Sequence, residues 1–325
     1  MRNLRTVRGW FGMKPEANAG MGSDETITAD SGTPSPWVVH GALLFVQLAL
    51  GSLHVEAKLA MGPDYGVSPL ALAMMRIAGT AAVFLPFYWF MGSARVRSWR
   101  DFGVLSILAV LGVVNNHTLY LMGLNITSPI SATLLVAMIP IFTMLIVAVT
   151  GRAHPTPRQV LGAAIAFLGI AVLVGFALPK PGDTLVLLNA ASFALYIVYS
   201  KDILGRLGVL TVITWVFGIS TVLFLPIGMP DVLAEGPNWS AGAIWLVIYI
   251  VLVPTVFFYG ANAWALRYAS PGQVTVYMFL QPVIVAVLAW FQLGQEMSVQ
   301  TLYAAILTMT GVGLVLTAKQ QAGKK

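Results

Sequence analysis

A few ionisable side chains lie inside long apolar stretches of this sequence. His54 and Glu56 fall within residues 37–59, and Arg76 falls within residues 68–92. If these stretches cross a bilayer, an ionised side chain at its centre costs about 2.5–3.5 kcal/mol, so each one needs a partner or a task. Histidine and glutamate can exchange protons, and a guanidinium matches the fork of a carboxylate. The three residues are therefore candidates for proton or charge coupling.

Arg76 has three interpretations that the sequence leaves open. In one of them its side chain snorkels outward to the membrane interface. A salt bridge to Glu56 would neutralise both side chains and tie their helices together, whereas a free guanidinium would suit a substrate carboxylate. His54 and Glu56 point about 200° apart on an unbroken helix, so they do not form one compact cluster. Lys58 is expected at the membrane interface with its ammonium in water.

Uncharged polar and aromatic side chains at middle depths of the other stretches could bind a small-molecule substrate. The run Asn-Asn-His at 115–117 points in three directions around a helix. At least one of its side chains should face other helices, where it makes either a helix–helix hydrogen bond or a substrate contact. The predicted substrate-binding residues are Gln47, Asn115, Asn116, His117, Tyr196, Tyr259, Tyr277 and Gln281.

The residue inventory argues against several other kinds of site. The chain has no cysteine, which excludes thiolate metal ligands, and its four histidines show no metal-binding spacing. No Gly-rich loop ends in Gly-Lys-Ser/Thr to hold a nucleotide. Gly218-x-Ser220 lacks the second glycine of a hydrolase motif. We therefore expect no metal, no cofactor, no nucleic-acid partner and no enzyme activity.

The candidate side chains must be positioned by membrane-spanning helices. Hydrophobic residues make up 58% of the chain and charged residues 9%, whereas soluble domains carry about 25% charged residues. A helix needs about 20 apolar residues to cross a bilayer. Ten stretches meet this need: 37–59, 68–92, 102–122, 129–150, 157–178, 184–200, 209–229, 241–261, 271–293 and 299–318. A disordered tail at 1–36 and a short tail at 319–325 remain, both expected in the cytoplasm.

The positions of the basic residues predict how these helices are oriented. With the N-terminus in the cytoplasm, the outer ends of the stretches carry Lys58 and Lys180. The inner ends carry nearly all other lysines and arginines, at 2–14, 95–100, 152–158, 201–206, 267 and 319–325. Because cytoplasmic loops are enriched in Lys and Arg, the sequence predicts a multi-pass protein in the lipid bilayer of the cell (inner or plasma) membrane. Both termini should be cytoplasmic.

The two halves of the chain resemble each other. Residues 119–140 align with 261–282 without gaps, and Pro140 falls opposite Pro282 in that alignment. A proline within a helix removes an amide donor and leaves the carbonyl one turn earlier without its partner. Either proline alone could simply kink a membrane helix, but paired helix interruptions at Pro140 and Pro282, in the fourth and ninth stretches, are typical of a transporter core. Because each half has five crossings, an odd number, the halves should have inverted topologies.

Small, aromatic and proline residues follow one another in a characteristic order. They lie in LGSLHVEAKLAM, SPLALAMMRIAGTAAVFLPF, LYLMGLNITSPISATLLVAMIPIFTMLIV, RQVLGAAIAFLGIAVLV, NAASFALYIVYSKDIL, ANAWALRYASPGQVTVYMFLQPVIVAVLAW and AAILTMTGVGLVL. In this order and spacing the chain resembles the drug/metabolite transporter (DMT) superfamily, EamA type. The resemblance implies an all-α polytopic membrane protein. Ten transmembrane helices would form two inverted five-helix repeats, 37–178 and 179–318, around a central cavity.

The resemblance also implies a function. Members of that family mostly carry amino acids and related metabolites, often outward, by alternating access. We therefore expect a secondary transporter that exports amino acids or related compounds. The alternatives from other classes are an intramembrane enzyme and a membrane scaffold or receptor that transports nothing.

Overall fold

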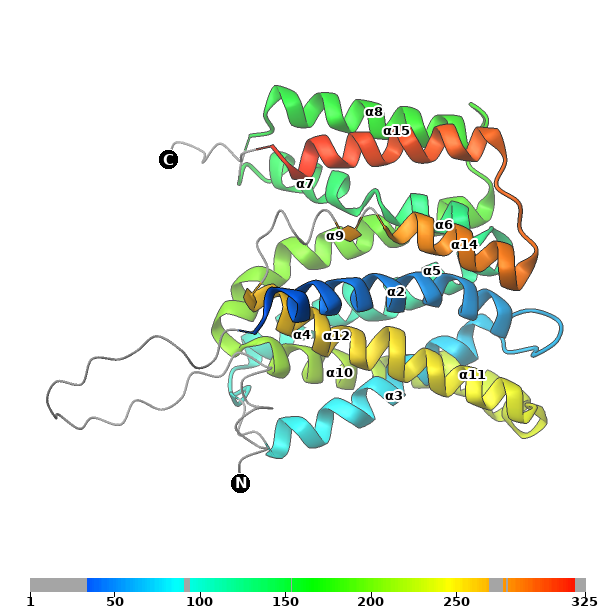
Figure 1. Cartoon of the computed structure of the whole chain (residues 1–325). Coiled ribbons are helices and arrows are strands. Elements are labelled where there is room, and N and C mark those ends of the chain that lie inside the picture. Colours follow the sequence, from blue (N-terminus) through cyan, green and yellow to red (C-terminus); the bar gives the residue numbers. More distant parts are fainter. Residues whose placement is uncertain (1–33, 91–93, 153, 269–276, 279, 319–325) are drawn as a thin grey trace, which may run out of the picture.

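The computed structural model of this chain describes residues 34–90, 94–152, 154–268, 277–278 and 280–318, and its regular elements are helices (Figure 1). They are α2 Pro36–Ala60, α3 Pro69–Phe90, α4 Trp99–Ala109, η1 Val110–Val114, α5 Asn115–Ile126, α6 Pro129–Val136, α7 Ile139–Val149, α8 Pro157–Leu173, α9 Pro181–Leu207, α10 Val209–Glu235, η2 Gly236–Asn238, α11 Ala241–Val251, η3 Leu252–Phe257, α12 Phe258–Tyr268, α14 Gln281–Leu293 and α15 Val299–Leu316. Apart from residues 34–36, the two predicted tails lie outside the described residues, as do residues 91–92 of the second predicted stretch and residues 271–276 and 279 of the ninth.

Among the residues that the structure describes, eight helical stretches are long and apolar enough to cross a membrane. They are Pro36–Ala60, Pro69–Phe90, Trp99–Ile126, Pro129–Val149, Pro181–Leu207, Val209–Asn238, Ala241–Asn262 and Val299–Leu316. The fifth and ninth predicted stretches contain shorter apolar helices, α8 and α14. The all-helical, polytopic membrane fold expected from the sequence is confirmed.

Several helices begin at a hydroxyl residue that satisfies the first turn. The Thr156 side chain accepts a hydrogen bond from the Gln159 amide, and the Gln159 side chain accepts one from the Thr156 amide, just before Pro157 opens α8. Ser128 caps α6 by accepting from the amide of Ser131. A first helical turn leaves amides unpaired, and proline has no amide to satisfy. These caps fix where the helices begin.

Helix packing follows a twofold pattern between the halves. The second and seventh predicted spans, α3 and α10, pack on each other, as do the fifth and tenth, α8 and α15. The third span (α5) packs on the sixth (α9), and the eighth (α12) packs correspondingly on the first (α2). The fourth span (α6 and α7) packs on α9, and the ninth (α14) packs on α2. Exchanging each helix for its counterpart in the other half therefore preserves these contacts.

Two of the helical spans contain a π-helical segment, and two others are interrupted beside a proline. Extending the alignment of the halves sets Val110, the first residue of η1, opposite Leu252, the first residue of η3. Pro140 is the second residue of α7, which follows a turn after α6, and Pro282 is the second residue of α14. Irregular backbone inside a membrane persists only where side chains or a polar cavity satisfy the freed groups. The four interruptions therefore point to the centre of the bundle.

Candidate functional site

The bundle encloses a cavity of about 680 Å³. Its lining reaches one end of the molecule at His154, Pro155 and Leu316. This end, where α2 begins and α15 ends (Figure 1), is called the terminal face, and the end where α2 stops and α3 begins is called the far face. On α2 the lining stops at His54, although the helix continues to Ala60. The cavity thus runs from the terminal face past the middle of the bundle and stops short of the far face.

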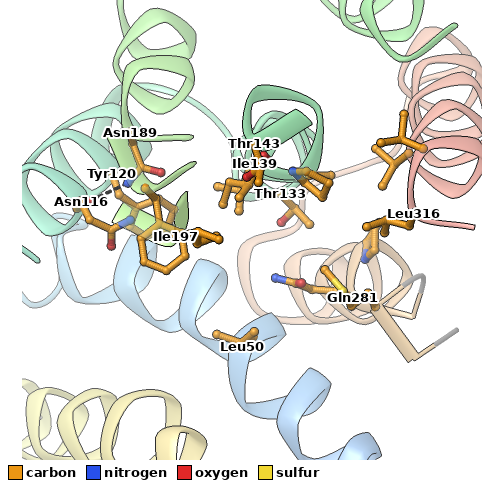
Figure 2. A pocket seen from close by; sticks show the side chains of 18 of the residues that line it. Leu50, Asn116, Tyr120, Thr133, Ile139, Thr143, Asn189, Ile197, Gln281 and Leu316 are labelled. Carbon is orange, nitrogen blue, oxygen red and sulfur yellow. Dashed lines mark hydrogen bonds between the residues drawn. The ribbon is translucent and has the colours of Figure 1, made fainter. Parts of the chain in front are cut away.

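Polar groups from several helices meet in this cavity. Figure 2 shows Asn116, Tyr120 and Asn189 gathered on one side and Gln281 on the other. Asn189 Nδ2 donates to the backbone carbonyl of Asn116 at 2.8 Å, which joins α9 to α5. The polar residues thus lie on helices from both halves of the chain.

Arg76 is the charged group at the inner end of the cavity. Its side chain is buried, with 6% exposure, and it belongs to the cavity lining. Its Nε and Nη2 each lie 3.4 Å from Thr255 Oγ1. Within the described ranges the only salt bridge joins Arg206 to Asp101, at 2.6 Å. The guanidinium therefore has a hydroxyl neighbour and no carboxylate partner in that part of the chain.

The proposed pairing of Glu56 with Arg76 is not formed. Gln292 Nε2 donates to Glu56 Oε1 at 2.9 Å, which links α2 to α14 near the far face. Arg76, on α3, and His54, on α2, both line the cavity, whereas Glu56 does not. Glu56 therefore points away from the face of α2 that meets the cavity. The rotation of about 100° per residue along an α-helix accounts for this separation.

Thr255 is oriented by the π-helical segment that carries it. Pro254 has no amide, so the carbonyl of Ile250 lacks its usual helical donor. Thr255 Oγ1 donates its proton to that carbonyl at 3.0 Å. Because this hydroxyl has one proton, it can meet Arg76 only as an acceptor. A proline in η3 thus determines which groups face the guanidinium.

His54 connects three helices at the cavity wall. Its Nε2 lies 3.1 Å from Gln281 Nε2, and its Nδ1 lies 2.8 Å from the Tyr120 hydroxyl. With the Gln281 amide donating to Nε2, the single ring proton is on Nδ1 and is donated to the Tyr120 oxygen. The hydrogen bonds join α2 to α5 and α14, the helices that follow two of the interruptions.

His117 is held by its own helix. Its Nδ1 donates to the Val113 carbonyl, the last but one residue of η1, at 2.9 Å, and its ring packs edge-on against Phe217. Nε2 then carries a lone pair, and this buried atom has no hydrogen-bond partner among the described residues. Because His117 also lines the cavity, a ligand donor could satisfy that nitrogen.

Several sequence-predicted residues meet in the cavity. Its lining includes the predicted residues His54, Arg76, Asn116, His117, Pro140, Tyr259, Gln281 and Pro282. Tyr259 lies edge-on between Phe217 and Phe84, with ring centroids 5.7 and 6.5 Å away.

The other predicted residues lie elsewhere. Tyr196 stacks on Phe193 behind the cavity wall, and Tyr277 OH lies 3.0 Å from His40 Nδ1. Gln47 is buried, and its Oε1 has no partner among the described residues. Five predicted residues are therefore absent from the described cavity lining: Gln47, Glu56, Asn115, Tyr196 and Tyr277.

Two important lining residues were missing from the predicted set. Thr255 contacts Arg76, and Tyr120 contacts His54. The dipeptide Pro254-Thr255 inside an apolar stretch was the available signal, because a hydroxyl residue beside a proline often bonds the carbonyl that the proline frees. Tyr120 gave no such signal.

The far face is held together by hydrogen bonds, and Lys58 is central to them. Its Nζ donates to the carbonyls of Leu124, Asn125 and Thr127 at 3.0, 2.7 and 3.0 Å. Thr127 Oγ1 in turn donates to Asp183 Oδ1 at 2.6 Å. The expectation that Lys58 extends into water was wrong, because the unpaired carbonyls at the C-terminal end of α5 attract its ammonium.

Comparison with known proteins gives the relatives of this fold. The model of the EamA-like transporter family matches residues 40–175 and again residues 180–317. An uncharacterized transporter of Archaeoglobus fulgidus is 26% identical over 287 residues, covering 86% of this chain and 93% of the relative. Protein WALLS ARE THIN 1 of Arabidopsis thaliana is 24% identical, with 90% and 86% covered.

Two further matches are a relative whose name states an activity and a solved structure with a similar fold. A probable terminal-alkyne amino-acid exporter of Streptantibioticus cattleyicolor is 26% identical over 254 residues, covering 77% of this chain and 84% of the relative. A protein crystal structure with 18% identity superposes with a TM-score of 0.56 and covers 86% of this chain and 98% of its own. At that identity the structural match concerns the fold alone.

Proposed function

The chain belongs to the EamA-like transporter family, and from that premise we propose that it carries small metabolites across a membrane by alternating access. One observation carries the proposal: a cavity reaches the terminal face, while hydrogen bonds of Lys58 close the far face. Alternating access requires a state with this asymmetry and a second state in which the closed and open ends are exchanged. The twofold packing of the halves supports such an exchange.

We propose export of amino acids or related compounds as the direction and substrate class. One relative is named as a probable amino-acid exporter. The cavity offers amide, imidazole and hydroxyl groups at Asn116, His117 and Tyr120 among largely apolar walls. A few convergent polar groups in an apolar pocket are typical of a site for a small molecule.

We infer an orientation with both termini in the cytoplasm of the cell (inner or plasma) membrane. The distribution of lysine and arginine supports it. Because the chain has no cysteine, single-cysteine labelling can test it. On intact cells, a membrane-impermeant maleimide should label Glu296→Cys, in the loop before α15, and should label Arg97→Cys only after permeabilisation. The reverse pattern would refute the orientation.

For coupling, His54 and Arg76 are better placed than Glu56. Both line the cavity, whereas Glu56 bonds to Gln292 near the far face. Protonation of His54 would put a proton on both ring nitrogens, so Gln281 would have to turn its amide oxygen toward the ring. We propose that His54 links proton binding to the position of Gln281. Flux that does not respond to a pH gradient would refute this role of His54.

The enzyme alternative has less support. Ser220, in the Gly-x-Ser sequence, is fully buried and donates its hydroxyl proton to the Ala109 carbonyl at 3.2 Å. No group of three His, Cys, Asp or Glu residues in the described ranges could hold a metal ion. A scaffold has no use for a cavity that reaches the middle of the bundle, and a receptor that binds its ligand there would show no flux.

Flux measurements in proteoliposomes test the proposal. Labelled amino acids and organic acids should show saturable flux with the wild-type chain. Thr143 lines the cavity on α7, whereas Thr150 at the end of α7 is exposed, and both hydroxyls bond the carbonyl four residues earlier. Thr143→Trp should therefore abolish flux and Thr150→Trp should preserve it. Absence of saturable flux across the panel, or equal flux in both variants, would contradict transport through this cavity.

A further inference from the structure

We propose that this cavity binds the carboxylate of an organic acid through Arg76, and that the rest of the acid is apolar and needs no ammonium group. The inference narrows the proposed substrate class, amino acids or related compounds, to related acids that lack the ammonium group, and so it rests on that proposed function. Binding can nevertheless be measured separately from transport.

The first step concerns the charge on Arg76. Its side chain is buried and lines the cavity, and among the described residues its hydrogen bonds are two long ones, of 3.4 Å each, to a single hydroxyl oxygen of Thr255. A guanidinium offers five N–H donors. A buried cation without a counter-ion is costly, and no aspartate or glutamate belongs to the described cavity lining. The unbound site therefore lacks one negative charge.

The second step concerns the shape of the missing group. A guanidinium presents its N–H groups in a planar fork that pairs with two oxygens of a carboxylate. The Thr255 hydroxyl gives its proton to Ile250 O, so it accepts from Arg76 without neutralising it. A carboxylate supplies both the charge and the two acceptors.

The third step concerns the rest of the ligand. Apolar side chains line much of the cavity, including Leu50, Leu53, Ile139, Phe193 and Phe258. Its volume of about 680 Å³ lies within the usual range for small-molecule pockets, about 300–1,000 Å³. An acid with an aromatic or aliphatic body would bury apolar surface against these walls.

The fourth step concerns the ammonium of an amino acid. That group would exchange water for uncharged acceptors such as His117 Nε2, and it would lie in a cavity that already contains the Arg76 cation. Like charges in a poorly solvated site repel. His117 Nε2 suits a neutral donor such as a hydroxyl. An acid without an ammonium should therefore bind more tightly than the corresponding amino acid.

Equilibrium binding to the purified full-length chain tests this. Three probes share one aromatic body: 3-phenylpropionate, its neutral amide and phenylalanine. Titration calorimetry should give an affinity for the acid at least about tenfold above that for the amide, as expected for charge-assisted hydrogen bonds. Phenylalanine should bind more weakly than the acid. Equal affinity for acid and amide, tighter binding of phenylalanine, or no binding of a wider acid panel would overturn the proposal.

Variants assign the preference to Arg76. Arg76→Gln should abolish the acid-over-amide preference, and Arg76→Lys should keep part of it. Arg100→Gln, at an exposed arginine outside the cavity lining, should keep it fully. If Arg76→Gln retains the preference, the proposal fails. If Arg76→Gln does not fold, the ratio of the wild-type affinities for the acid and the amide still tests whether the cavity prefers a carboxylate.

The two proposals can fail separately. Saturable flux of metabolites without acid preference would leave the transport function standing and overturn the carboxylate assignment. Arg76-dependent binding of the acid, with no flux of any compound in proteoliposomes, would support the carboxylate assignment and overturn the transport function.

Discussion

At the scale of single residues, two polar side chains of the cavity donate their protons to the backbone of their own helices. His117 donates to the Val113 carbonyl, and Thr255 donates to the Ile250 carbonyl. Each therefore presents a lone pair, at His117 Nε2 and at Thr255 Oγ1. The local chain thus determines which side chains act as acceptors near Arg76.

Thr255→Val should show what the hydroxyl contributes. The change leaves the Ile250 carbonyl without its donor and Arg76 without its acceptor, which should cost about 1–3 kcal/mol of stability and weaken substrate binding. Thr221→Val is the matched control, because Thr221 also bonds a carbonyl in its own helix, that of Phe217, outside the cavity lining. Denaturation and binding assays check both. Equal losses in the two variants would argue against a special role for Thr255.

Two neighbouring asparagines provide a second residue-scale prediction. Asn116 lines the cavity and Asn115 does not, while the backbone carbonyl of Asn116 accepts from Asn189 in either case. Asn116→Ala should change the apparent KM for a transported substrate by several-fold, and Asn115→Ala should leave it unchanged. Transport kinetics check this, and a larger effect at Asn115 would mean that α5 is rotated differently.

At the scale of helices, the α8–α15 pair depends on close backbone approach. These two helices run side by side (Figure 1). A Cβ atom placed on Gly311 would collide with the backbone of Gly162 and Ala166, and one placed on Gly169 would collide with Thr308. In a membrane, where lipid is as apolar as the side chains, small residues let helices gain van der Waals contact and stay together.

Gly311→Ala should therefore destabilise the protein. Adding one methyl group forces the two helix backbones apart, with a cost of about 1–3 kcal/mol expected for overpacking. Gly103→Ala in α4 is the control, since a Cβ there meets nothing within 4 Å, and alanine is the better helix former. Thermal unfolding in detergent should give a lower Tm for Gly311→Ala and an equal or higher Tm for Gly103→Ala. A Tm unchanged at Gly311 would contradict the close contact.

At the scale of the whole molecule, the cavity and the far-face hydrogen bonds describe one closed end and one accessible end. Lys58 ties the end of α2 to the end of α5, and Thr127 ties that same region to Asp183 at the start of α9. The cavity lining extends instead to Leu316 and His154 at the terminal face. Hydrogen bonds to a few carbonyls can break and re-form, so this closure can be reversed.

Lys58→Met should loosen the far face. The cavity residue Leu50→Cys, in a chain without other cysteines, reports access to a maleimide added from the far-face side. Labelling should be slow with Lys58 present and several-fold faster with Lys58→Met, because three hydrogen bonds to carbonyls are lost. The control Lys180→Met, at an exposed lysine before α9, should leave the rate unchanged. Equal rates in all three backgrounds would show that Lys58 does not close this end.

Much of this architecture could be predicted from the sequence, because the relevant constraints are local. A bilayer demands long apolar helices, so hydropathy located the spans, and an ionisable residue inside one of them marked a place of interest. Pro140 and Pro282 could be recognised as a pair because both stand in the same position of aligned halves. His54, Arg76, His117 and Gln281 were found by these rules and do line the cavity.

Only the tertiary structure decided the partners of these residues. Apolar spans carry little periodicity, so the sequence reports poorly which face of a helix meets its neighbours. The π-helical segments η1 and η3 add to this, since an extra residue in a turn rotates everything after it by about 100°. Three outcomes depend on how each helix faces its neighbours: the pairing of Glu56 with Gln292 rather than Arg76, the place of Thr255 beside the guanidinium and the binding of the Lys58 ammonium by carbonyls of α5.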